Sequence, residues 1–214
     1  MTGPVKRDAP STIGRGQART RLARRAVVNA ARTLFLERGY AATTIEAISE
    51  HSDVPSATVY RLFSSKLGIL KALLDTSIAG DDQSAAVQER PNVASLFTEP
   101  DPHKLLAGFA GITTAINQRT KDVYSVLVSA AGSDPAATEL LSMLRQQRDR
   151  GQGQIARSLA RARALKSGLR ERDAADLIHA LMSPEVYRLL VGDRGWTAER
   201  YQQWLATTLT QQLT

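Results

Sequence analysis

The sequence predicts an all-α protein with two helical domains, and three observations lead to this fold class. Apolar residues recur at a helical period along most of the 214 residues, and we find no stretch that predicts a strand. Two short helical segments around a four-residue turn, near residues 43–63, are typical of a helix-turn-helix. The length exceeds that of a small helix-turn-helix unit and leaves room for a second, larger helical domain.

Composition and helix-ending residues predict the first elements of the chain. Residues 1–17 are rich in Gly, Pro, Ser and basic groups, and we expect a disordered basic arm there. A helix from about Ala18 to Arg38 should end at Gly39. Its apolar face is formed by Val27, Ala31, Leu34 and Phe35.

The second and third helices flank the turn at residues 52–55. Thr43 and Glu46 form a T-x-x-E capping box, which predicts that the second helix begins at Thr43. The third helix is expected over Ser56–Phe63, with Pro55 at its first helical position, where a missing N–H costs nothing. We therefore predict a domain over residues 18–66, followed by a second domain over residues 67–214.

A fourth helix should start near Ser65, with Leu67, Leu70, Leu73 and Leu74 on its apolar face, and link the two domains mechanically. Residues 80–102 contain several Pro, Gly and acidic residues and predict a looser connection. Further helices are expected at about residues 103–119, 121–131, 135–165, 171–191 and 197–213. Gly151 and Gly153 predict a kink or a break in the third of these.

Charge and composition narrow the function. Residues 1–75 hold 12 Lys and Arg against 6 Asp and Glu, whereas the remaining residues are nearly balanced. A basic first third indicates a polyanionic partner once the helix-turn-helix is taken into account. The absence of cysteine excludes disulfides, thiolate catalysis and cysteine-ligated zinc, and we expect no cofactor. No segment predicts a membrane span or a targeting signal, so we expect a cytoplasmic protein.

The chemistry of the helix-turn-helix indicates which residues would contact double-stranded DNA. Small residues at the start of the third helix let the backbone approach base edges, and Thr58 offers a hydroxyl and a methyl group. Arg61 suits a guanine or a phosphate, or is a solvated side chain. Tyr60, Lys66 and Thr44 suit phosphate oxygens. The predicted DNA-binding residues are Thr44, Pro55, Ser56, Ala57, Thr58, Tyr60, Arg61 and Lys66.

Other residues near this surface have simpler interpretations. Tyr60 is also suited to packing the third helix on the first. Val59, Leu62 and Phe63 are expected in the core rather than on DNA. The arm arginines reach a minor groove or raise nonspecific affinity; they are Arg15, Arg19, Arg21, Arg24 and Arg25.

Residues 22–74 resemble the N-terminal domain of the tetracycline-repressor (TetR) family of bacterial transcription regulators. The residues that carry the resemblance are Ala30, Ala31, Leu34, Phe35, Glu37–Tyr40, Thr43, Thr44, Ile48, Val54, Thr58–Tyr60, Phe63, Ser65 and Lys66. The sequence departs from the family pattern at Asp53, where glycine is usual, and at Ser56, where a basic residue is frequent. Asp tolerates a left-handed conformation, so the turn should survive.

The resemblance implies a homodimeric repressor that binds a palindromic operator and is released by a small-molecule effector. Pairing is expected through the last two helices, although their apolar faces suit the monomer's own core as well. The residues of these faces are Ala174, Leu177, Ile178, Leu181, Tyr187, Leu190, Tyr201, Trp204, Leu205 and Leu209. An effector pocket is expected between residues 103 and 165. Its candidate residues, which an ordinary core would also contain, are Phe109, Thr113, Asn117, Tyr124 and Met143.

Three alternatives remain open at this stage. The same scaffold serves transcriptional activators. A protein that coats DNA without reading its sequence would share the basic first third. The third alternative is a helical enzyme. Asp176 and His179 lie three residues apart on one helix face, a spacing that suits a proton relay or a metal, and Glu185 follows. No third ligand at diagnostic spacing accompanies them, so we predict neither catalytic nor metal-binding residues.

Overall fold

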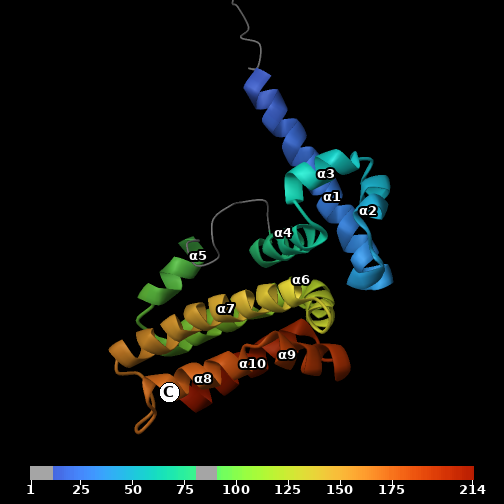
Figure 1. Cartoon of the computed structure of the whole chain (residues 1–214). Helices are drawn as coiled ribbons and strands as arrows, with labels where there is room; N and C mark the ends of the chain where they lie inside the picture. The colour runs from blue at the N-terminus through green and yellow to red at the C-terminus, as the bar shows by residue number, and fades with distance from the viewer. Residues whose placement is uncertain (1–11, 81–90) are drawn as a thin grey trace, which may run out of the picture. The chain divides into compact units, whose positions relative to one another are not determined.

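The computed structural model describes residues 12–80 and 91–214, and its regular elements are all helical within these ranges (Figure 1). The all-α prediction is confirmed. The chain divides into two compact units between Leu73 and Leu74. The predicted boundary, between Lys66 and Leu67, lies seven residues earlier and falls within the same helix, α4 (Lys66–Ala79). This helix therefore belongs to both units.

Helix α1 (Thr12–Ala42) begins earlier than predicted, because residues 12–17 are helical rather than part of an arm. Residues 1–11 of the predicted arm lie outside the described residues. Gly39 interrupts the helix as predicted, with φ 77° and ψ 168°, a left-handed φ that favours glycine. The predicted apolar face of α1 is buried.

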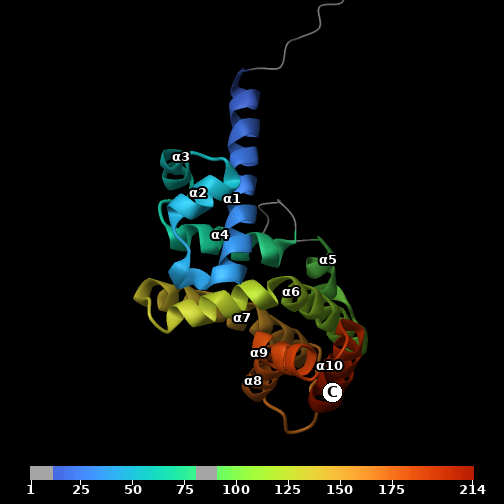
Figure 2. The same ribbon diagram turned by 90° about the vertical axis from the view of Figure 1, so that its right-hand side faces the viewer.

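Helices α2 (Ile45–Ser52) and α3 (Ser56–Phe63) lie beside α1 in unit 1 (Figure 2). The span of α3 matches the prediction. The predicted cap of α2 was wrong by one residue, because Thr44 is the N-cap and accepts a hydrogen bond from the Ala47 amide. Thr43 is instead fully buried. Pro55 precedes α3 and does not occupy its first helical position.

Unit 2 contains the remaining helices. They are α5 (Pro91–Ala94), η2 (Ser95–Thr98), α6 (Pro102–Ala131), α7 (Pro135–Arg161), α8 (Glu171–Leu181), α9 (Pro184–Tyr187), the π-helix η3 (Arg188–Asp193) and α10 (Ala198–Leu213). Long helices α6 and α7 form an antiparallel hairpin, against which α10 and α8 pack (Figure 1).

Several predicted boundaries in this unit were wrong. The two helices predicted over residues 103–131 are one, since the sequence there offers no Pro or Gly break at residue 120. Helix α7 continues through Gly151 and Gly153, because tertiary packing overrides the low helix propensity of glycine. The helix predicted over residues 171–191 is divided at Met182, where the Ser183 hydroxyl accepts from the Val186 amide and Pro184 starts a new turn. Residues 91–98, predicted as loose, are helical.

The apolar faces predicted for pairing mostly form the core of unit 2. Six of the ten residues of these faces are buried within the chain, namely Ala174, Ile178, Tyr187, Tyr201, Leu205 and Leu209. Leu177, Leu181, Leu190 and Trp204 are only half-buried. Fewer apolar residues therefore remain for pairing than the sequence pattern indicated.

Candidate DNA-binding surface

The turn between α2 and α3 is fixed by backbone conformation and by Ser49. Asp53 adopts φ 53° and ψ 27°, the left-handed conformation for which the family pattern usually has glycine. The Val54 amide donates to the Ser49 carbonyl oxygen at 3.3 Å, and the Ser49 hydroxyl donates to the Val54 carbonyl oxygen at 2.7 Å. These reciprocal bonds fix the direction in which α3 leaves the turn.

Helix α3 buries one face and exposes the other. Val59 and Phe63 are buried, as predicted. On the other side Ala57 and Arg61 are exposed and Tyr60 is 49% exposed. Pro55 is exposed, while Ser56 and Thr58 are half-buried. The DNA-binding residues predicted on α3 and just before it thus lie at the start and on the outer face of this helix, where bases and phosphates can reach them.

Thr44 lies exposed at the start of α2, where its oxygen accepts the Ala47 amide at 3.1 Å. A hydroxyl that accepts as an N-cap still has its own O–H to donate. The hydroxyl hydrogen and the first amides of α2 are therefore suited to a phosphate oxygen.

Lys66 is held in a cluster of carbonyl groups that the sequence did not reveal. Its ammonium donates to the carbonyl oxygens of Tyr40 at 2.6 Å, Thr43 at 2.8 Å and Ala41 at 3.4 Å. It also lies 4.3 Å from the centre of the Tyr40 ring. An ammonium has three donors, and three carbonyls of the α1–α2 connection receive them. Lys66 thus fixes the connection that presents Thr44.

The break at Gly39 explains why these carbonyl groups need partners. A helix end leaves carbonyl oxygens without intrahelical donors. The buried Thr43 hydroxyl is within hydrogen-bond distance of the carbonyl oxygens of Gly39, at 2.8 Å, and Leu34, at 3.2 Å. Thr43 and Lys66 together satisfy the end of α1, which is why Thr43 does not cap α2.

Gly68 allows α4 to pack directly on the end of α3. A β-carbon at residue 68 would collide with the Phe63 carbonyl oxygen. The Ser65 hydroxyl accepts the Gly68 amide at 3.0 Å and so caps the start of α4. A lone glycine within a helical pattern is the sequence signal for such a close approach.

The arm arginines have different environments. Arg24 donates to the Leu62 carbonyl oxygen at 3.1 Å and lies 4.5 Å from the centre of the Phe63 ring, so it caps α3. Arg19, Arg21 and Arg25 are exposed on α1. The side chain of Arg15 lies outside the described residues.

The five predicted effector residues differ in how deeply they are buried. Phe109, Thr113 and Asn117 are buried on α6. Tyr124 is half-buried, and Met143 is 49% exposed on α7.

Tyr124 belongs to a polar network that joins four helices. Its hydroxyl donates to Glu185 Oε1 at 3.1 Å, and burial, followed by the Glu185 carboxylate, raises its pKa. Arg148 pairs with Glu185 at 3.6 Å and donates to His179 Nε2 at 3.2 Å. Because arginine cannot accept, His179 Nε2 must accept and its Nδ1–H donates to Gln152 Oε1 at 3.1 Å.

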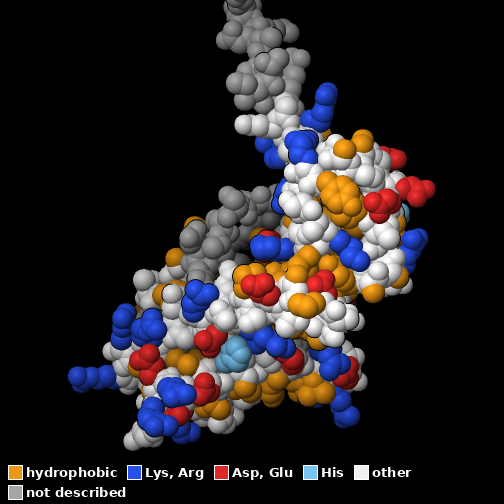
Figure 3. Space-filling view, viewed as in Figure 1, with side chains coloured by type: hydrophobic (Ala, Val, Ile, Leu, Met, Phe, Trp, Pro, Cys, Tyr) orange, Lys and Arg blue, Asp and Glu red, His pale blue; other side chains and the backbone are white. Residues whose placement is uncertain are grey.

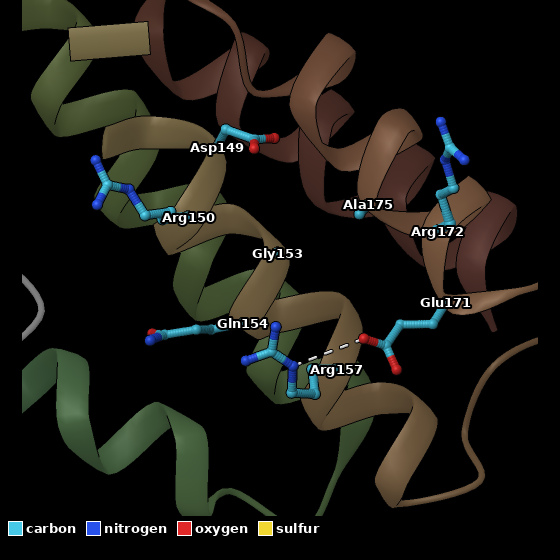
Figure 4. Close-up of a pocket in the computed structure, with 8 residues that line it drawn as sticks. All are labelled: Asp149, Arg150, Gly153, Gln154, Arg157, Glu171, Arg172 and Ala175. Atoms are coloured by element: carbon cyan, nitrogen blue, oxygen red, sulfur yellow. Dashed lines mark ion pairs between the residues drawn. The ribbon is translucent and has the colours of Figure 1, made fainter. Parts of the chain in front are cut away.

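Figure 3 shows this mixture of basic and acidic side chains on the surface of unit 2. An open groove of about 660 Å³ lies nearby, between α7 and α8. Gly153 on α7 and Ala175 on α8 are among its lining residues. Arg157 and Glu171 point toward one another across it at 3.6 Å, whereas Arg150 and Gln154 extend away from α8 (Figure 4). None of the five predicted effector residues lines it.

The enzyme alternative gains no support from this geometry. The His179 ring lies 3.8 Å from the Asp149 carboxylate and pairs with Gln152 rather than with Asp176. Over residues 12–80 and 91–214, no cluster of His, Asp and Glu suits a metal ion. Within the same ranges no helix is both long and apolar enough to cross a membrane.

Comparison of the sequence with known families gives a match over the helix-turn-helix unit. Residues 27–73 match the model of the bacterial regulatory proteins of the tetR family. The chain is 42% identical over 48 residues to the transcriptional regulator YvkB of Bacillus subtilis, covering 22% of this chain and 25% of YvkB. It is 35% identical over 88 residues to the regulator TcmR of Streptomyces glaucescens, covering 41% of this chain and 38% of TcmR.

Solved structures resemble the chain over most of its length. NalD, described as the secondary repressor of the MexAB-OprM multidrug efflux pump in Pseudomonas aeruginosa, has a TM-score of 0.65 at 20% identity, covering 91% of this chain and 98% of NalD. The fatty acid degradation regulator FadR from Bacillus halodurans has a TM-score of 0.64 at 13% identity, covering 96% of this chain and 97% of FadR. SmeT, solved with triclosan, has a TM-score of 0.62 at 17% identity, covering 87% of this chain and 89% of SmeT. These likenesses show a shared fold.

Proposed function

We propose that this chain, a transcription regulator with the DNA-binding domain of the tetR family, is a homodimeric repressor that a small-molecule effector releases from a palindromic operator. The observation that carries the proposal is the exposed face of α3, whose orientation the Asp53 turn, Lys66 and Gly68 fix. Such a face has the size and shape to enter a major groove. A repressor of this kind works beside the DNA, in the cytoplasm.

Arg61 is the proposed base-reading residue, and Thr44 and Tyr60 are the proposed phosphate anchors. Pro55, Ser56, Ala57 and Thr58 form the close-approach surface at the start of α3. Because the Lys66 donors point at backbone carbonyl groups, we now assign Lys66 to positioning rather than to phosphate contact.

Pairing is proposed through the partly exposed apolar residues of α8, η3 and α10. Leu189 is 50% exposed, and Leu177, Leu181, Leu190 and Trp204 are half-buried. Apolar area of this kind is what a symmetric helical interface buries. Sedimentation at micromolar concentration should give twice the chain mass of 23.3 kDa, and a mass of one chain would contradict the homodimer.

Release is proposed to act through α4, which begins in unit 1 and ends in unit 2. Arg119 on α6 donates from Nε to the Ser77 carbonyl oxygen and from Nη2 to the Ile78 carbonyl oxygen, both at 3.0 Å. A shift of α6 on effector binding would therefore be transmitted to the last turn of α4. NalD is a repressor and SmeT binds triclosan, which supports repression and effector binding here by analogy of fold.

The test is binding of the purified protein to the DNA that flanks its own gene, by anisotropy with scrambled competitor. We expect competitor-resistant binding at an inverted repeat whose half-sites lie about 34 Å apart. Binding that the competitor abolishes, at this site and after selection from random DNA, would favour the sequence-indifferent alternative. A reporter driven from the site distinguishes repression from activation.

Arg61→Ala tests the reading role on the selected operator. The substitution should weaken binding to the preferred operator by about 1–3 kcal/mol. The loss should be smaller at operators that differ from it by one base pair, so base preference relaxes. Equal losses on all sequences would make Arg61 a backbone contact. The exposed Lys71 on α4 provides the matched control, because Lys71→Ala should leave the preference unchanged.

A further inference from the structure

Asn117 is a buried amide whose donors are unused. It lies on α6 with 4% of its surface exposed, and its Nδ2 atom has no hydrogen-bond partner within the described part of the chain. Buried donors are nearly always satisfied in folded proteins, because water has been removed from them and nothing replaces it. An exception in the core of a ligand-responsive domain needs an explanation.

The neighbour of Asn117 across the core is Tyr201 on α10. Burial raises the pKa of the Tyr201 hydroxyl and the nearby Asn117 amide offsets part of that rise, although the amide nitrogen does not reach hydrogen-bond geometry. The Tyr201 hydroxyl itself donates only a long bond of 3.4 Å to the Leu181 carbonyl oxygen. The Tyr201 ring stands edge-on to Tyr187, with centroids 4.8 Å apart, and is tilted against Trp204 at 5.8 Å. An amide donor and a weakly engaged hydroxyl therefore lie together among aromatic rings.

The charge of the surroundings determines what the pair can bind. Apart from the largely buried Arg148, whose charge is paired with Glu185, the buried polar side chains described in unit 2 are neutral. They are Ser77, Thr113, Thr114, Asn117, Thr120, Gln152 and Ser183. An ion brought among them would lose its hydration without gaining a counter-charge, which is strongly unfavourable. A neutral molecule with an acceptor would instead satisfy the unused donors.

The segment next to this pair is the least regular part of unit 2. Tyr187 ends the four-residue α9 and is followed by the π-helix η3 and by Gly195 at φ 68°. Short π-helical turns occur frequently at functional sites. On its outer side, α9 is held by the half-exposed Glu185 through ion pairs of 3.6 and 3.8 Å. The pair with Arg145 is half-exposed on both sides and contributes little to stability, so on this side α9 is held mainly by Arg148 and by the Tyr124 hydroxyl.

We propose that Asn117 and Tyr201 form the polar anchor of a site for a neutral, largely apolar ligand with a carbonyl-type acceptor, which enters beside α9 and η3. This inference rests on the proposed function, because it names the chemical class of the effector. Asn117 donates to the acceptor, and the rings of Tyr187, Tyr201 and Trp204 surround the apolar part.

The experiment uses the three asparagines of the chain, at positions 29, 92 and 117. The full-length protein, labelled with ¹⁵N only at asparagine, is titrated with 4-phenyl-2-butanone, a neutral ketone, and separately with 3-phenylpropionate, its charged counterpart. We expect saturable shifts of the Asn117 side-chain amide with the ketone and none with the carboxylate. Asn117→Leu identifies the signal and should weaken ketone binding about fivefold, the effect of one lost hydrogen bond.

Two further variants keep the test decisive. Asn29→Leu changes an exposed asparagine of unit 1 and should leave ketone affinity unaltered. Tyr201→Phe removes only the hydroxyl and should weaken binding even where Asn117→Leu does not fold. An unmoved Asn117 signal at millimolar ketone, or equal shifts with the carboxylate, overturns the inference while specific DNA binding still stands. If the ketone binds but operator affinity does not change, release by this ligand class fails and the binding site itself stands.

Discussion

The two units of this chain use polar side chains in different ways. In the DNA-binding unit, Thr43, Lys66 and Arg24 all direct their donors to backbone carbonyl groups. Unit 2 also contains such bonds, but between α6, α7, α8 and α9 its polar side chains pair with one another, as Tyr124 does with Glu185 and His179 does with Gln152. The first arrangement fixes the course of the backbone, whereas the second holds helices together through groups that can exchange partners.

This difference suits what we propose for each unit. A small domain has a small core, so caps and close backbone contacts must define the angle between α2 and α3. A DNA-binding domain needs this angle to be fixed at one value. A domain that responds to a ligand needs two arrangements of similar free energy, and side-chain pairs at half-exposed positions can break without leaving buried backbone groups unsatisfied.

The largest effect expected from this comparison is that of Gly68→Ala. The added methyl group meets the Phe63 carbonyl oxygen, and neither backbone segment can move without disturbing α3. We expect unit 1 to lose about 3 kcal/mol of unfolding free energy and the protein to lose operator binding. Both tryptophans, Trp196 and Trp204, lie in unit 2, so their fluorescence should report an unchanged urea midpoint while circular dichroism detects early loss of helix.

Gly153→Ala is the matched control in the other unit. A β-carbon there meets nothing within 4 Å, and alanine in a helix interior is favoured over glycine by about 1 kcal/mol. This variant should stabilise unit 2 and leave DNA affinity unchanged. If both glycine variants behaved alike, the close approach of α4 to α3 would not be what fixes the reader.

The contrast also separates what the sequence could predict from what it could not. The span of α3, the stop at Gly39 and the turn at Asp53 followed from local signals: helical period, glycine and left-handed tolerance. The carbonyl cluster around Lys66 did not, because its members lie 23 to 26 residues from Lys66 in the chain. A lysine in a basic domain predicts a phosphate contact unless its distant neighbours are known.

In unit 2 the sequence predicts where helices occur but not all of their limits. It also does not show how deeply each candidate effector residue is buried. Phe109 and Asn117 share a helical face, which periodicity shows, whereas Met143 projects outward because the pairing of α6 with α7 sets its face. Asn117 was a candidate like its neighbours. Only burial without a partner distinguishes it, and burial depends on packing across 84 residues, from Asn117 to Tyr201.

The second prediction, Lys66→Ala, tests whether positioning differs from contact. It removes a cation that three carbonyl groups share. A hydrogen bond to a charged group contributes about 1.5–3 kcal/mol, but Lys66 is only half-buried, so water can replace it at some of these carbonyl groups. We expect unit 1 to be destabilised by about 2 kcal/mol and operator binding to weaken with an unchanged dependence on salt. A salt slope lower by about one unit, with stability intact, would restore Lys66 as a phosphate contact.

Arg119→Ala should have a smaller effect on stability and a more specific effect on regulation. The guanidinium bonds to the Ser77 and Ile78 carbonyl oxygens are partly exposed to solvent, so we expect a loss of about 1 kcal/mol. Operator affinity without ligand should change little, whereas release by an effector that binds unit 2 should weaken. The measurement is the ratio of operator affinities with and without ligand. A ratio equal to that of the unaltered protein would place the coupling elsewhere than at the end of α4.

The smallest effect is expected at the turn, from Asp53→Gly. Residue 53 lies at φ 53°, where glycine carries no steric penalty and aspartate carries a modest one. Glycine also increases the freedom of the unfolded chain, which offsets part of the gain. We therefore expect unit 1 to become more stable by less than about 1 kcal/mol, with base preference unchanged because the direction of α3 is set by the Ser49 and Val54 bonds. A changed preference would mean that the Asp53 carboxylate itself influences the DNA, and would assign the departure from the family pattern a role in recognition.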